Sequence, residues 1–154
     1  MNPMNQVPVH ATVAQRYRGL LIIWFAQFVT LGLFVLVVWL TRVPRNGSND
    51  ALRFWVFDVL GGATFALSFV LKYKLLRRAS EQQRPDVVTT AYVLAFALCE
   101  ATAIFGLVNY FLSGVPPLTL FAVALFGMAL HVPRRVELLK ASPPDGVSFK
   151  SSLQ

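Results

Sequence analysis

Four long apolar runs separated by short polar segments dominate the pattern of this chain. The first is "LLIIWFAQFVTLGLFVLVVWL" at 20–40, and the others cover about 54–71, 90–112 and 117–132. An α-helix needs about 20 apolar residues to cross the hydrocarbon core of a bilayer. We therefore predict an all-α, polytopic membrane protein whose four transmembrane helices form two antiparallel hairpins.

The polar segments between the runs are too short to fold into separate soluble domains. We predict one four-helix membrane domain over 1–140 and a disordered cytoplasmic tail, "ASPPDGVSFKSSLQ", over 141–154. The loop "TRVPRNGSND" contains the turn dipeptide Asn46-Gly47. The segment "KYKLLRRASEQQ" holds good helix formers, so we expect the second helix to continue beyond the membrane toward Pro85.

Composition supports a membrane protein and excludes several other classes. Hydrophobic residues make up 56% of the chain and charged residues 14%, whereas soluble domains are about a quarter charged. The net charge of +7 does not predict a nucleic-acid partner, because the basic residues flank apolar runs and form no stripe. We also find no metal-ligand cluster, phosphate loop or nucleophile triad. We therefore expect no metal, no cofactor, no small-molecule substrate and no enzyme activity beyond that of a subunit in an ion-translocating complex.

The distribution of Lys and Arg predicts how the chain is oriented. Eleven of the 14 Lys and Arg residues precede the first run, lie between the second and third, or follow the fourth. The other three are Arg42, Arg45 and Arg53. Cytoplasmic loops carry the excess of basic residues in membrane proteins. We therefore predict a multi-pass protein with both termini in the cytoplasm, in a bacterial inner membrane.

Among the polar residues within or at the ends of the apolar runs, four are candidates for a specific role. Glu100 is near the centre of the third run, at roughly 16 Å from its cytoplasmic end, and Asp58 is about one turn inside the outer end of the second. Intramembrane carboxylates are costly and are functional candidates by default, although Asp58 can also reach the interface or pair with Arg53. We interpret Gln27 as a hydrogen-bonding link between helices and His131 as a solvated boundary residue.

Small residues predict close packing between the second and third helices. They recur about every four positions on the third run, at Ala91, Ala95, Cys99, Ala103 and Gly106. A matching series on the second run comprises Asp58, Gly62 and Ala66. Gly61 and Gly62 fall at about the depth of Glu100, where glycines let two backbones approach. We predict that the helices cross there and that Gly62→Leu lowers stability.

The segment that begins at Glu100 resembles a known motif. Glu100, Ala101, Ile104, Phe105, Gly106, Leu107 and Val108 match the pattern E-A-x-x-I-[FY]-G-L-V in order. This pattern is typical of the proteolipid c subunit of rotary ATP synthases, which the chain resembles over about residues 60–112. The polar loop "RRASEQQRPD" is also similar to the loop of that family. The resemblance implies a helical hairpin whose carboxyl, here Glu100, binds a proton.

Several residues depart from the pattern of the c subunit. The second run has only Gly61 and Gly62 in place of a glycine ladder, and it carries four bulky side chains: Trp55, Phe57, Phe65 and Phe69. The ordinary c subunit lacks the first and fourth runs. The four-span proteolipids of vacuolar-type enzymes carry their essential acid in the last span, where this chain has none.

Two functional hypotheses follow from these observations. In the first, Glu100, with Asp58 nearby, binds a proton or a sodium ion in a translocating assembly. In the second, the chain is an accessory or structural subunit of a membrane complex, and Glu100 is a buried structural acid. Both imply contact with the lipid bilayer and assembly into an oligomer or a larger membrane complex.

Overall fold

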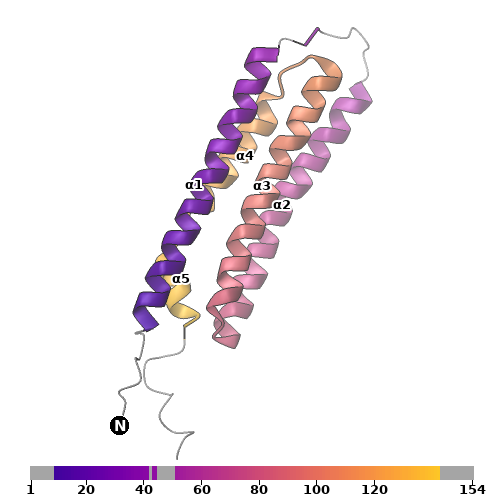
Figure 1. Cartoon of the computed structure of the whole chain (residues 1–154). Helices are drawn as coiled ribbons and strands as arrows, with labels where there is room; N and C mark the ends of the chain where they lie inside the picture. The colour runs from indigo at the N-terminus through magenta and orange to yellow at the C-terminus, as the bar shows by residue number, and fades with distance from the viewer. Residues whose placement is uncertain (1–8, 42, 45–50, 143–154) are drawn as a thin grey trace, which may run out of the picture.

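The computed structural model describes residues 9–41, 43–44 and 51–142, and their regular structure is entirely α-helical (Figure 1). Five helices follow one another along the chain: α1 (Val9–Thr41), α2 (Ala51–Gln82), α3 (Pro85–Ser113), α4 (Leu118–Leu130) and α5 (Arg135–Lys140). The predicted Asn46-Gly47 turn and all but the first two residues of the predicted tail lie outside the described residues.

Three of the helices are long and apolar enough to cross a membrane. These segments are Val13–Thr41, Trp55–Gln82 and Pro85–Ser113. α4 has 13 residues, which gives about 20 Å of helix, whereas the hydrocarbon core is about 30 Å thick. The prediction of an all-helical protein is therefore confirmed, three of its helices could span a membrane, and the fourth predicted run forms a shorter apolar helix.

Two tight turns join α2 to α3 and α3 to α4. At the first turn Gln83 has a positive φ of 50°, and the N–H of Arg84 donates to the Ala79 carbonyl at 3.0 Å. α3 then begins with Pro85, which needs no hydrogen-bond acceptor at the first helical position. At its other end Gly114 has φ 70°, the left-handed conformation that terminates many helices, and its N–H donates to the Tyr110 carbonyl.

α3 is the central helix of the bundle. α2 packs mainly along α3, while α1 packs against α3, α4 and α5 (Figure 1). Within the described residues α1 makes no contact with α2. The predicted hairpin of the first two helices is therefore not a packed pair. The connecting residues 42–50 can reach about 30 Å when extended, so adjacency in sequence does not force these helices together.

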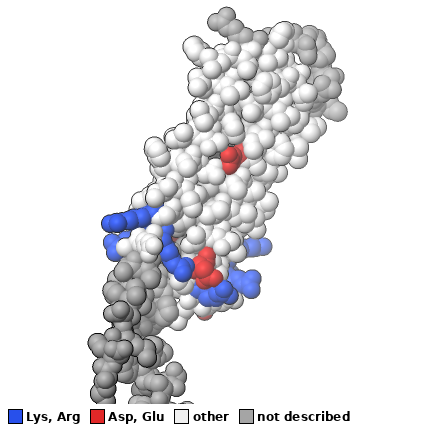
Figure 2. All heavy atoms as spheres, in the orientation of Figure 1, with Lys and Arg blue, Asp and Glu red and all other residues white. Residues whose placement is uncertain are grey.

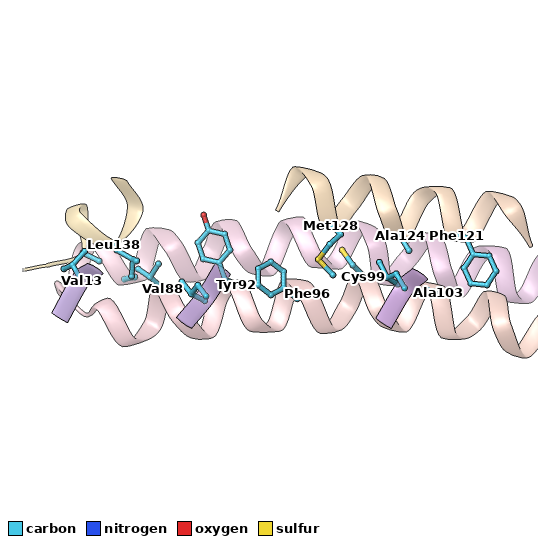
Figure 3. Close-up of a cluster of buried hydrophobic side chains, with 14 residues drawn as sticks. Val13, Val88, Tyr92, Phe96, Cys99, Ala103, Phe121, Ala124, Met128 and Leu138 are labelled. Carbon is cyan, nitrogen blue, oxygen red and sulfur yellow. The ribbon is translucent and has the colours of Figure 1, made fainter. Parts of the chain in front are cut away.

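The buried core follows one side of α3. Figure 3 shows Cys99 of α3 beside Met128 of α4 and Ala103 of α3 beside Ala124 of α4, while Tyr92 lies on the side toward Leu138 of α5. Large apolar side chains also cover the outside of the bundle; Ile22 is 70% exposed and Phe25 is 63% exposed. Soluble monomers rarely expose contiguous apolar patches of more than a few hundred Å², so this outer surface fits a hydrocarbon environment.

Charged side chains gather at one end of the bundle. Figure 1 shows that the start of α1, the turn between α2 and α3, and α5 all lie at this end, and Figure 2 shows its blue basic side chains. The described Lys and Arg side chains all come from these segments or the end of α2: Arg16, Arg18, Lys72, Lys74, Arg77, Arg78, Arg84, Arg134, Arg135 and Lys140. We call this region the basic end.

Candidate functional site

Glu100 lies in the middle of α3, at the edge of its buried side. Its side chain is half-buried, next to the fully buried Cys99. Within the described part of the chain, no hydrogen bond or ion pair links Glu100 to another residue. In Figure 2 the middle of this face of the bundle carries no basic side chain, and the blue side chains lie well away from it, at the basic end. Glu100 is therefore an isolated carboxyl in the apolar middle of the bundle.

The predicted stripe on α2, to which Asp58 belongs, is exposed in the structure. The Asp58 side chain is exposed, as are Gly62 and Ala66 of the same predicted stripe. A Cβ added to Gly62 would meet no atom within 4 Å. The predicted stripe of α2 therefore faces away from α3, and of the two glycines predicted at the crossing, Gly62 makes no close contact. A larger side chain at Gly62 would meet open space, so the structure gives no packing reason for the predicted loss of stability. α2 buries Gly61 and Ser68. Because neighbouring residues of a helix are about 100° apart around its axis, Gly62 points away from the face that contains Gly61.

The close crossing of α2 and α3 occurs at Gly61. The Thr102 hydroxyl donates to the Gly61 carbonyl at 3.2 Å, and the hydroxyls of Thr64 and Thr102 lie 2.9 Å apart. A Cβ on Gly61 would lie 2.5 Å from Cδ2 of Leu120 and 3.5 Å from Cγ2 of Thr102. The absent side chain of Gly61 thus makes room for α4 as well as α3.

The small residues predicted along α3 are all buried, and α4 covers two of them. Ala91, Ala95, Cys99, Ala103 and Gly106 all face the core. A Cβ on Gly106 would meet Pro117 and Leu120 at 3.3 and 3.2 Å, and a Cβ on Gly127 would lie 2.9 Å from the Cys99 sulfur. These predicted packing positions therefore hold α4, in addition to the predicted partner α2.

Gln27 does not form the predicted link through its side-chain oxygen. Gln27 is half-buried on α1, and its Oε1 is buried without a hydrogen-bond partner in the described residues. Oδ1 of Asn109, on α3, is in the same condition. Unpaired polar atoms are costly in an apolar environment. Both atoms are therefore acceptors left free inside the bundle.

His131 is a core residue, which the sequence analysis did not predict. The side chain is fully buried, so its interpretation as a solvated boundary residue is wrong. Its Nε2 lies 3.0 Å from the Ser68 hydroxyl, and its ring centroid is 4.4 Å from that of Phe69. The other ring nitrogen, Nδ1, is buried without a partner in the described residues. The ring of His131 is thus enclosed by its contacts with Ser68 and Phe69 of α2.

A second set of polar contacts ties α5 to the bundle beside His131. The buried Tyr92 hydroxyl donates to the Glu137 carboxylate and accepts a hydrogen bond from the Arg134 backbone N–H at 3.0 Å. The ammonium nitrogen of Lys72 lies 4.3 Å from the Tyr92 ring centroid, a favourable position for a cation above an aromatic face. The sequence signal for this contact was the short amphipathic segment "RVELLK" that forms α5.

The fold and these positions define an all-helical protein with three helices able to span a membrane and one isolated carboxyl midway along its central helix. Comparison with protein families, with curated proteins and with solved structures finds no match to this chain. Among the described residues, no group of three His, Cys, Asp or Glu side chains is placed to hold a metal ion.

Proposed function

We propose that this chain is a multi-pass membrane protein in which α1 to α4 all cross the bilayer and the basic end faces the cytoplasm. The segregation of the described Lys and Arg side chains to one end supports this orientation, because basic residues are retained on the cytoplasmic side. α4 spans less than a full bilayer thickness, but short helices are accommodated by local thinning of the bilayer at modest cost.

Within this membrane domain, we propose that Glu100 binds a proton. The observation that carries the proposal is the unpaired, half-buried carboxyl in the middle of α3. Carboxyl groups inside a membrane are costly and are functional candidates by default. The resemblance of the segment after Glu100 to the c subunit of rotary ATP synthases supports the same role. The side chain of Asp58 is exposed on α2, so the proposal assigns the proton to Glu100 alone.

The alternative is a non-translocating accessory or structural subunit. This function is favoured by the position of α1 and α4, which pack against α3 and occupy flanks that neighbouring hairpins of a closed ring would need. Under this hypothesis Glu100 donates a hydrogen bond to another subunit and never exchanges its proton.

Carbodiimide labelling separates these two functions. Dicyclohexylcarbodiimide enters membranes and attacks protonated carboxyls, so the proton-binding hypothesis predicts one modification per chain, at Glu100. The labelling is measured from mildly acidic to alkaline pH. Glu100→Gln abolishes the modification, and the matched control Asp58→Asn retains it. Mass spectrometry of the intact protein in membranes measures both. No modification from mildly acidic to alkaline pH would remove the proton-binding role and leave the accessory one.

A further inference from the structure

A groove lies between the first turns of α1 and the first half of α3, near the basic end. It has a volume of about 580 Å³, and its walls are mainly apolar, with Val93, Leu94 and Ala97 on the α3 side. This volume is within the usual range of about 300–1,000 Å³ for small-molecule sites. Val93 and Ala97 are exposed, so the groove opens along the side of the bundle that would face lipid.

Among the polar side chains that line this groove, Arg16 is a cation without an anionic partner. Arg16 and Asp86 both line it, but the Asp86 carboxylate already pairs with the Arg84 guanidinium at 2.8 Å. No ion pair joins Arg16 to another residue in the described part of the chain. The groove therefore combines an apolar wall with one uncompensated positive charge.

The two threonines of the groove do not alter this balance. The Thr89 hydroxyl donates to the Pro85 carbonyl at 3.5 Å, and the Thr90 hydroxyl donates to the Asp86 carbonyl at 3.2 Å. Both hydroxyl protons are thus used within α3. A ligand that fits this groove needs an anionic group for Arg16 and an apolar chain for the wall, and it makes few other hydrogen bonds.

We propose that this groove binds one anionic phospholipid, with the headgroup phosphate against Arg16 and an acyl chain along Val93, Leu94 and Ala97. The proposal rests on the membrane orientation proposed above, which puts Arg16 at the level of the cytoplasmic headgroups and the apolar wall in the hydrocarbon. Basic pockets between transmembrane helices on the cytoplasmic side are a recurring way to hold anionic headgroups. The positive charge of Arg16 favours an anionic headgroup, and the apolar wall of the groove binds an acyl chain.

Native mass spectrometry of the full chain in detergent tests this site with two lipids that share their acyl chains. We expect dioleoylphosphatidylglycerol to bind with one-to-one stoichiometry and at least fivefold more tightly than dioleoylphosphatidylcholine. Arg16→Gln should lower the affinity for phosphatidylglycerol about fivefold, as expected for one basic residue near a membrane surface. Arg18→Gln is the matched control, because Arg18 is exposed on the same helix and does not line the groove.

A second pair of variants tests the apolar wall. Ala97→Phe fills the groove and should weaken binding of both lipids, whereas Ala122→Phe places the same ring on an exposed position of α4 and should leave binding unchanged. All four positions are exposed, and thermal unfolding in detergent checks that each variant keeps its fold. Glycerol 3-phosphate, which has the phosphate and lacks the acyl chains, should not compete.

Four outcomes would overturn the lipid site. They are equal affinity of the wild type for the two lipids, unchanged preference in Arg16→Gln, unchanged binding in Ala97→Phe, and full competition by glycerol 3-phosphate. None of these measurements involves Glu100. If Glu100 is labelled by the carbodiimide but the lipid selectivity fails, the lipid site is removed and the proposed function stays in place. If the lipid selectivity is found but Glu100 is not labelled, the lipid site stays and the proton-binding role is removed.

Discussion

Gly127 and Gly62 illustrate how much the surroundings of one residue determine its role. A Cβ on Gly127 would lie 2.8 Å from Cε2 of Phe65 and 2.9 Å from the Cys99 sulfur, whereas a Cβ on Gly62 would meet no atom within 4 Å. The Phe65 ring is rigid and stacks edge-on with Phe69 at a centroid distance of 5.1 Å, so it cannot move away at low cost. Gly127 is thus the glycine at which α4 meets α2 and α3.

We expect Gly127→Ala to lower the free energy of unfolding by about 1–3 kcal/mol, the usual range for overpacking a well-filled core. Gly62→Ala should raise it by up to about 1 kcal/mol, because alanine is the better helix former and the space is open. Thermal unfolding of each variant in the same detergent measures both. Equal effects of the two substitutions would contradict the packing at Gly127.

α1 shows how an element that is apolar on every side still docks through one stripe. Val13, Leu20 and Leu31 are its buried apolar side chains among those described, and their spacing places them along one face. Trp24 lies on the same face, and its indole Nε1 donates to the Met128 carbonyl of α4 at 2.9 Å. Just beyond the C-terminal end of α1, the Val43 N–H donates to the Tyr110 hydroxyl at 3.1 Å. α1 is therefore attached to α3 and α4 at two levels.

Trp24→Phe should weaken the attachment of α1 by removing the hydrogen bond to Met128 while keeping an aromatic ring in place. We expect a loss of about 0.5–1.5 kcal/mol in the free energy of unfolding, the usual net contribution of one hydrogen bond. Trp39→Phe is the control, since Trp39 is 74% exposed and should change stability little. Denaturant unfolding in detergent compares the two variants, and equal losses would argue against the docking of α1 on α4.

At the scale of the whole molecule, the charges and the apolar surface divide the bundle into two regions. The described basic side chains lie at one end, and the rest of the outer surface is mainly apolar (Figure 2). The start of α1, the turn before α3 and α5 meet at that end, as Figure 1 shows. A bilayer can surround such a bundle with its basic end on the side that retains positive charge.

Single cysteines placed in a Cys99→Ala background test this orientation. Ser80→Cys and Lys140→Cys lie at the basic end and should be protected from a membrane-impermeant maleimide in intact cells, whereas Pro116→Cys, in the turn before α4, should react. Lys140→Cys is the decisive position for α4, because it lies beyond that helix. Reaction of Lys140→Cys together with Pro116→Cys would mean that α4 does not cross, and the reverse pattern at all three would invert the topology.

The fold class could be predicted from the sequence because it depends on local properties. Long apolar runs must form helices in a bilayer, where every backbone hydrogen bond has to be made within the segment. The small-residue series from Ala91 to Gly106 also identified the buried side of α3 correctly. The stripe through Asp58 and Gly62 failed, because an apolar helix shows no hydrophobic face and two stripes one residue apart cannot be distinguished by spacing alone.

The candidate site could also be predicted only in part from the sequence. An acid in the middle of an apolar run is visible in one sequence, so Glu100 could be found without coordinates. Its lack of a partner, its separation from Asp58, and the burial of His131 against Ser68 depend on helices that are far apart in the chain. The groove lined by Arg16 and the first half of α3 likewise needs α1 and α3 side by side, although residues 42–84 lie between them in sequence.

The sequence by itself therefore determined the helices, their apolar character and the end at which basic charge collects, because these depend on neighbouring residues and on the solvent. Only the tertiary structure decided which face each helix buries, that α1 packs on α3 and α4 and not on α2, and that α5 packs against α1, α2 and α3. The physical reason is that lipid and protein interior are equally apolar. Burial between apolar helices is thus set by shape and by a few hydrogen bonds, which exist only once distant segments have come together.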